Sequence, residues 1–203
     1  MEFQIKKLTK DLVDDYIYFF DTENHSDNQD EHKCYCVCWC SDDHRTGLDK
    51  MSSASKRRAL AKEYISQGMI KGYLAYDKEK VVGWVNANDK SSCINCISWL
   101  INLKEVNTST SKKVKSVFCF TVASLYRRKG VATQLLQRVI QDAREDGYEE
   151  IEAYPKKEIK HLDDFEGPLS MYLKQGLVIK KEFIVNKSHD NSRNNLFVSS
   201  IFL

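Results

Sequence analysis

The chain has 203 residues and a formal net charge of +2, and 30% of its residues are charged. A chain of this length can bury a hydrophobic core as one unit, so we predict a single domain over residues 1–203. The near balance of charge argues against a dedicated nucleic-acid-binding protein, and no apolar run reaches the roughly 20 residues of a membrane span. The start Met1-Glu2-Phe3 lacks the basic and then apolar pattern of a secretory signal, so we expect a cytoplasmic protein.

Alternating and helical apolar patterns predict the elements of the first half of the chain. They are a strand at residues 3–5, a helix at 9–20, a strand at 34–40, a helix at 53–67, and strands at 70–76 and 81–88. Thr9 is the expected N-cap of the first helix, and Gly68 the expected stop of the second. The polar stretches at 21–33 and 91–115 are interpreted as connections between elements.

Seven cysteines are present, and four of them alternate with larger residues from Cys34 to Cys40. Alternation at period two predicts that these four thiols form a line on one face of a strand. A line of side chains cannot close a tetrahedron around zinc, and adding Cys93 and Cys96 does not make a metal site the favoured interpretation. We predict no metal and free thiols that pack in the core or line a pocket.

The second half of the chain begins with an apolar strand at Val117–Ala123, which leads through the basic turn Arg127–Gly130 into a helix that ends near Gly147. The first N–H groups of a helix point out of its N-terminus, where the macrodipole is positive. An anion placed there is bound by the backbone, and the three basic side chains of the turn add charge. Further elements are predicted as a strand at 150–154, a helix at 167–177, and strands at 178–185 and 196–202.

The basic turn resembles the signature of the GNAT N-acetyltransferases, Arg/Gln-x-x-Gly-x-Gly/Ala, which here reads Arg127-Arg128-Lys129-Gly130-Val131-Ala132. The Val122-x-x-x-x-Arg127 spacing also follows the superfamily. A second resemblance is Tyr172-x-x-x-Gly176-Leu177, where the superfamily has Tyr-x-x-x-Gly-Phe. The hairpin that contains Val82-Gly83-Trp84 is similar to the central hairpin of these proteins.

The resemblance implies an α/β fold of the α+β type, with a mixed, largely antiparallel central sheet flanked by helices. It also implies transfer of an acetyl group from acetyl-CoA, as co-substrate, to an amine by direct attack in a ternary complex. Tyr172 matches the position of the general acid that protonates the leaving thiolate. The residues implied to bind acetyl-CoA are Phe120, Thr121, Val122, Arg127, Arg128, Lys129, Gly130, Val131, Ala132 and Thr133.

The chain departs from the superfamily at Leu177, which replaces the usual Phe, and at Phe165-Glu-Gly-Pro, which stands where an Asn is common. Four carboxylates are alternatives for the general base: Glu152, Asp163, Asp164 and Glu166. A small-molecule amine and a peptide amine both fit as acceptor, with no nucleic-acid or membrane partner expected, and a homodimer is left open. The alternative function is a non-catalytic acyl-CoA-binding sensor.

Overall fold

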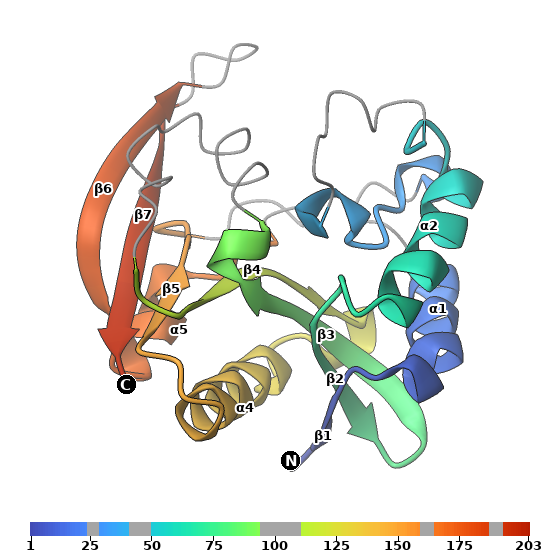
Figure 1. The fold of residues 1–203 in the computed structure, drawn as a ribbon, viewed down its shortest axis with the longest axis horizontal. Coiled ribbons are helices and arrows are strands. Elements are labelled where there is room, and N and C mark those ends of the chain that lie inside the picture. The colour runs from blue at the N-terminus through green and yellow to red at the C-terminus, as the bar shows by residue number, and fades with distance from the viewer. Residues whose placement is uncertain (24–28, 41–49, 94–110, 159–164, 187–192) are drawn as a thin grey trace.

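The computed structural model describes residues 1–23, 29–40, 50–93, 111–158, 165–186 and 193–203. The described strands form one sheet in the order β1-β2-β3-β4-β5-β7-β6 (Figure 1). All neighbours in it are antiparallel except β4 and β5, which are parallel. Their bounds are β1 Gln4–Lys7, β2 Gly72–Asp77, β3 Lys80–Asp89, β4 Val114–Val122, β5 Glu150–Ala153, β6 Val178–Asn186 and β7 Arg193–Phe202. The predicted fold class, a mixed and largely antiparallel sheet with flanking helices, is confirmed.

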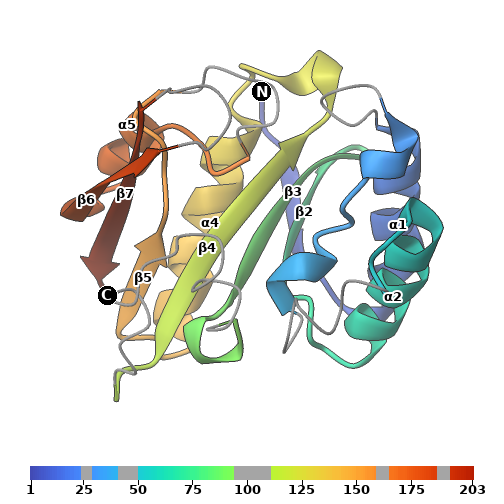
Figure 2. The ribbon, with the colours of Figure 1, turned by 90° about the horizontal axis from the view of Figure 1, so that it is seen from above.

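Helices cover both faces of the sheet (Figure 2). Helix α1 (Val13–Thr22), together with α2 (Ala54–Ser66), packs on one face, and α4 (Val131–Glu145) packs on the other. Successive residues of β3 face opposite sides, so Trp84 packs edge-on against Tyr16 of α1 at 4.8 Å between ring centroids, whereas Gly83 faces Val131 of α4. A short helix, α5 (Leu169–Lys174), precedes β6.

The strand predicted at Cys34–Cys40 is wrong. The segment is a turn followed by a 3-10 helix, Val37–Cys40, and its residues Tyr35 and Cys36 have φ angles of 47° and 50°. This left-handed backbone ends the alternation of an extended strand, so the thiols do not form a line. The Cys36 sulfur instead lies 3.0 Å from the Cys119 sulfur of β4, and both side chains are buried. Among the described residues, no group of three or more His, Cys, Asp or Glu side chains could hold a metal ion.

Several element boundaries differ from the prediction by a few residues. Strand β4 begins at Val114 rather than Val117, and a 3-10 turn at Lys10–Leu12 separates Thr9 from α1. Ser53 is the N-cap of α2, since its Oγ accepts a hydrogen bond from the Lys56 N–H at 3.2 Å. Most of the predicted 91–115 connection lies outside the described residues.

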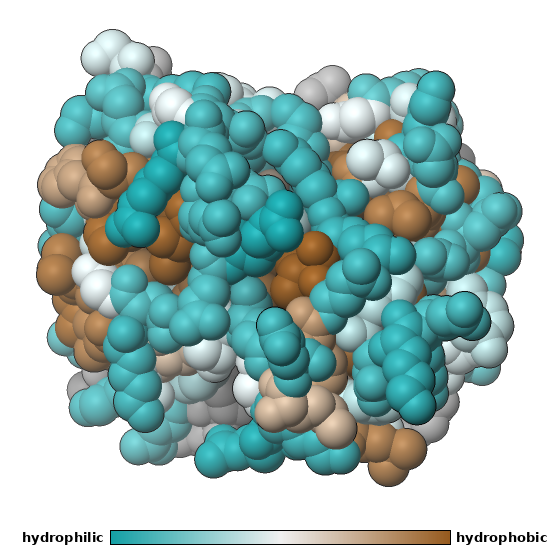
Figure 3. All heavy atoms as spheres, turned by 90° about the horizontal axis from the view of Figure 1, so that it is seen from below, coloured by the Kyte–Doolittle hydropathy of each residue, from teal (hydrophilic) through white to brown (hydrophobic). Residues whose placement is uncertain are grey.

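The end of the sheet formed by β6 and β7 carries exposed apolar side chains, and Figure 3 shows the apolar surface on this side of the molecule. Val178, Ile179 and Phe202 of these strands, and Leu173 of the preceding helix α5, are between 43% and 56% exposed. A homodimer stays a prediction. No helix within the described part of the chain has the length and apolar character needed to cross a membrane.

Candidate functional site

The two parallel strands at the centre of the sheet separate toward their C-terminal ends (Figure 2). Strands β4 and β5 pair only from Val114 opposite Glu150 to Val117 opposite Ala153. Beyond β4, the N–H of Ala123 donates to the Val82 carbonyl on β3 at 3.0 Å. Because N–H groups alternate in direction along a strand, those of Val122 and Phe120 point to the side of β5 and that of Thr121 points to β3. Two of the three predicted strand residues therefore direct a donor into the gap.

A segment later in the chain lies in this gap between β4 and the residues that follow β5, and we name residues Phe165–Pro168 the strap. The Phe120 N–H of β4 donates to the Phe165 carbonyl at 2.7 Å. On the other side, the Lys156 N–H donates to the Gly167 carbonyl at 3.3 Å, and the Leu169 N–H donates to the Lys156 carbonyl at 2.8 Å. The strap is thus bonded to β4 and to the chain that continues from β5.

Tyr172 of α5 points from its helix toward the strap. Its side chain is fully buried, and its hydroxyl donates to the Glu166 carbonyl at 2.6 Å. Its ring lies edge-on to the Phe120 ring at 6.3 Å between centroids. Burial, with a smaller contribution from the Glu166 carboxylate, raises the pKa of Tyr172 well above its ordinary value. The phenol is therefore a neutral hydrogen-bond donor at physiological pH.

The N-terminus of α4 lies at the same end of the sheet, after a 3-10 turn at Ser124–Tyr126. Gly130 precedes the helix with φ of +87°, a left-handed conformation that favours glycine. The Gln134 N–H makes the first helical hydrogen bond, to the Gly130 carbonyl at 3.0 Å. The N–H groups of the three residues before it point out of the helix end, as expected for an anion site, and these residues are Val131, Ala132 and Thr133.

The basic residues of the turn surround this helix end. The side chains of Arg127, Arg128 and Lys129 are exposed. The Arg127 Nε donates to the Val122 carbonyl at the end of β4 at 3.3 Å, and the Lys129 ammonium lies 5.2 Å from the centre of the Tyr126 ring. The structure thus brings the predicted turn and helix residues together beside the end of β4, and we name this group of residues the basic cradle.

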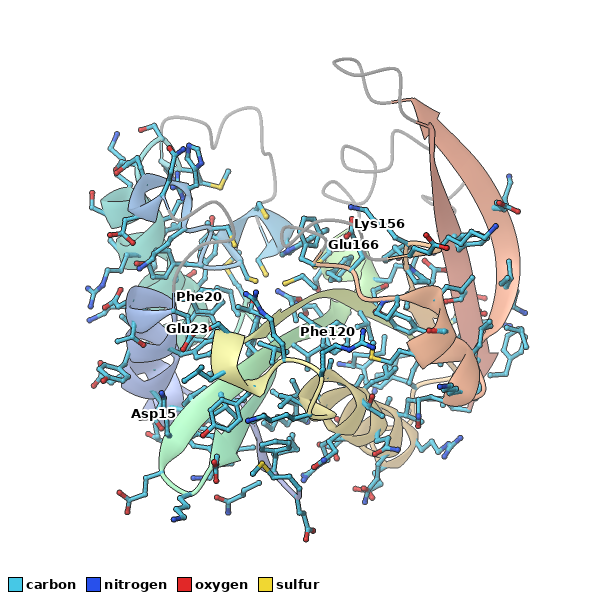
Figure 4. The ribbon with its side chains drawn as sticks, turned by 180° about the vertical axis from the view of Figure 1, so that it is seen from behind. Asp15, Phe20, Glu23, Phe120, Lys156 and Glu166 are labelled. Atoms are coloured by element: carbon cyan, nitrogen blue, oxygen red, sulfur yellow. The ribbon has the colours of Figure 1, made fainter. Side chains whose placement is uncertain are left out.

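The carboxylates considered for the general base have different surroundings. Glu152 is buried and forms an ion pair with Lys90 at 2.9 Å, and it also accepts a hydrogen bond from the Tyr154 hydroxyl. Glu166 lies in the strap and forms an ion pair with Lys156 at 3.3 Å. In Figure 4, Lys156 and Glu166 lie together above Phe120, near the gap. Asp163 and Asp164 lie outside the described residues.

An aromatic cluster that the sequence pattern did not indicate borders the strap. Trp39 stacks on Phe118 at 4.9 Å and meets the Phe165 ring edge-on at 5.7 Å. Phe118 stacks on Tyr154 at 5.7 Å. The cluster connects the cysteine-rich turn to the strap, and only the unexpected 3-10 helix at Val37–Cys40 places Trp39 there.

Comparison with protein families shows that the model of the acetyltransferase (GNAT) family matches residues 51–160. The match contains the central hairpin, β4, the basic turn and α4, so the resemblance seen in the sequence is confirmed. A comparison with curated protein sequences gives no match.

Solved structures with a similar fold include N-acetyltransferases. The Drosophila melanogaster polyamine N-acetyltransferase has a TM-score of 0.59 at 11% identity, with 100% of both chains covered. The putative acetyltransferase yncA of Salmonella typhimurium, solved with its cofactor acetyl-CoA, has a TM-score of 0.54 at 13% identity, with 98% of this chain and 93% of that chain covered. A chain of the NatC complex bound to Gag peptide and CoA has a TM-score of 0.53 at 14% identity, with 100% and 99% covered. At these identities the likeness concerns the fold.

Proposed function

The chain belongs to the acetyltransferase (GNAT) family, and we propose that it is an N-acetyltransferase that transfers the acetyl group of acetyl-CoA to an amine. The observation that carries the proposal is the basic cradle at the N-terminus of α4, directly after a strand with donors aimed into a gap. The free N–H groups from Val131 to Thr133 suit the pyrophosphate of coenzyme A, and the exposed Arg127, Arg128 and Lys129 supply positive charge. The acyl arm then extends from the cradle along β4 toward Phe120.

The proposed reaction is a direct attack within a ternary complex. The neutral amine attacks the thioester carbonyl carbon, and the developing oxyanion accepts hydrogen bonds from backbone N–H groups of β4 that face the gap, those of Phe120 and Val122. The nitrogen of the tetrahedral intermediate loses a proton to water, and collapse of the intermediate breaks the carbon–sulfur bond, forms the amide and releases the thiolate of coenzyme A. Tyr172 supplies a proton to that thiolate, because its phenol is neutral at physiological pH.

The attacking amine must first lose a proton, since an alkylammonium group has a pKa of about 10.4 in water. Both described carboxylates are ion-paired, but Glu166 directly follows the residue that contacts Phe120, and its ion pair with Lys156 is the longer one at 3.3 Å. Glu152 pairs with Lys90 at 2.9 Å and also accepts a hydrogen bond from the Tyr154 hydroxyl. We propose Glu166, directly or through water, ahead of Glu152 as the group that accepts this proton. Two similar folds, the polyamine enzyme and the peptide-bound NatC chain, support small-molecule and peptide amines as the two acceptor classes to test.

Two measurements test the proposal. Titration calorimetry measures acetyl-CoA binding, and thiol release is followed over a panel of polyamines, amino acids and peptide N-termini. We expect Arg128→Ala to weaken acetyl-CoA binding by about tenfold, the effect of losing one charge-assisted hydrogen bond. The matched control is Arg144→Ala, which removes an exposed arginine from the opposite end of α4 and should leave the affinity unchanged. Absence of acetyl-CoA binding at high micromolar concentration refutes the proposal.

A non-catalytic acyl-CoA sensor is the second candidate. The observation that favours it is the hydrogen bond from the Phe120 N–H to the Phe165 carbonyl, because this donor is already occupied by the chain itself. A sensor binds acetyl-CoA in calorimetry but gives only background thiol release with every amine. Turnover of any amine above that background decides for the enzyme.

A further inference from the structure

Two hydrogen-bond donors that the proposed reaction needs are occupied by consecutive carbonyl groups of the strap. The Phe120 N–H, the proposed oxyanion donor, is bonded to the Phe165 carbonyl at 2.7 Å. The Tyr172 hydroxyl, the proposed acid, is bonded to the Glu166 carbonyl at 2.6 Å. One short segment therefore covers both groups at once.

Side chains also hold the strap in this position. Glu166 forms its ion pair with Lys156, and these two side chains are only 14% and 18% exposed. The Phe165 ring packs edge-on against Trp39. Together with the backbone hydrogen bonds of the strap to β4 and to Lys156, these contacts hold the strap over Phe120 and Tyr172. We name this arrangement the covered state, and it is a defined state of the protein rather than a loosely packed loop.

We infer that the strap is an internal substitute for the acyl group, and that acetyl-CoA binds by displacing the Phe165 carbonyl from the Phe120 N–H. A thioester carbonyl oxygen and the Phe165 oxygen cannot both lie within hydrogen-bond distance along the same N–H direction, so the two compete for one donor. Displacement of the strap also withdraws the Glu166 carbonyl from Tyr172. Donor binding thereby frees the oxyanion donor and the acid in one step. This inference rests on the proposed function.

The competition has a measurable consequence for affinity. When only a fraction of the protein has the open arrangement, the apparent dissociation constant equals the intrinsic constant divided by that fraction, so it is raised. Tyr172→Phe removes one hydrogen bond from the covered state, so we expect acetyl-CoA to bind about fivefold more tightly to this variant. If Tyr172 acts only as an acid, its variant loses turnover while the dissociation constant for acetyl-CoA stays the same.

The matched control is Tyr148→Phe. Tyr148 is another buried tyrosine, and its hydroxyl donates to the Asp89 carboxylate near the other end of β4, away from the strap. We expect this variant to bind acetyl-CoA with wild-type affinity. Thermal unfolding of both variants checks that each is folded at the temperature of the titration.

Hydrogen–deuterium exchange of the wild-type protein provides an independent test. In the free protein we expect the N–H groups of Lys156 and Leu169, which are bonded across the strap, to be protected. Saturation with acetyl-CoA should speed exchange in the peptides containing them by at least about tenfold, while the peptide containing Phe120 stays protected by its new acceptor. Calorimetry on the same sample measures occupancy.

The outcomes separate this inference from the function on which it rests. If acetyl-CoA binds and exchange in the strap peptides is unchanged or slower, the strap stays in place and the inference is wrong, while the proposed function stands. Equal or weaker acetyl-CoA binding by Tyr172→Phe also overturns the inference. If acetyl-CoA does not bind at all, both the proposed function and the inference fall.

Discussion

Gly83 of β3 sets how closely α4 approaches the sheet, and replacing it with alanine tests the proposed cradle. A Cβ at this position would lie 2.5 Å from the Val131 Cγ1 and 3.4 Å from the Leu135 Cδ1. Val131 is the first residue of α4 and is 1% exposed, and a valine in a helix has one strongly preferred rotamer. The added methyl group must therefore move the start of α4 away from the sheet.

The cost can be worked out from this contact. Overpacking of a well-packed core costs about 1–3 kcal/mol, and alanine recovers about 0.4–1 kcal/mol by restricting the unfolded chain. We expect Gly83→Ala to lower the free energy of unfolding by about 1–2 kcal/mol, measured by urea denaturation. Since the displaced residue carries one of the N–H groups of the cradle, acetyl-CoA binding should weaken about fivefold in calorimetry.

Gly147→Ala is the control for this prediction. Gly147 follows the other end of α4 with φ of +71°, and a Cβ there would meet nothing within 4 Å. The left-handed backbone makes alanine cost about 1 kcal/mol of stability, but the N-terminus of α4 is undisturbed. We expect wild-type acetyl-CoA affinity. A Gly83→Ala protein with wild-type stability and affinity, or an equal loss of affinity in both variants, would refute the reasoning.

Three further predictions concern side chains whose environments the structure defines. Lys90→Met leaves Glu152 buried without its cation and should lower the free energy of unfolding, measured in urea, by about 3 kcal/mol. A variant that loses turnover but keeps wild-type stability would instead assign Glu152 to the reaction. Burial lowers the pKa of Lys115 to about 8, so between pH 8 and about 10.4 the unfolded chain holds a proton that the folded chain has lost. The free energy of unfolding of the wild type should therefore rise with pH in this range relative to that of Lys115→Met. Parallel curves of urea stability against pH for the two proteins would contradict this. Ser53→Ala removes the cap that accepts the Lys56 N–H and should cost about 1 kcal/mol in the same assay, whereas no loss would show that the cap is not stabilising.

The sequence by itself determined the parts of the site that are continuous in the chain. The strand before the basic turn, the turn with its glycine, and the amphipathic helix that begins at Val131 are set by local periodicity and by the conformations that glycine permits. For that reason these elements could be predicted with their residues, while anion binding by them stays a prediction. The Tyr172-x-x-x-Gly176 helix was predicted for the same reason.

Only the tertiary structure decided what these groups touch. The contact between Phe120 and Phe165 joins residues 45 positions apart, and the ion pair of Lys90 with Glu152 joins residues 62 positions apart. Such pairs leave no period in the sequence, because they depend on how separate elements pack. The error at Cys34–Cys40 has the same cause: alternation predicts a strand, yet packing against β4 holds Tyr35 and Cys36 in a left-handed turn. The sequence thus predicts the basic turn and its helix, whereas the packed fold alone reveals that the strap bonds to Phe120 and Tyr172.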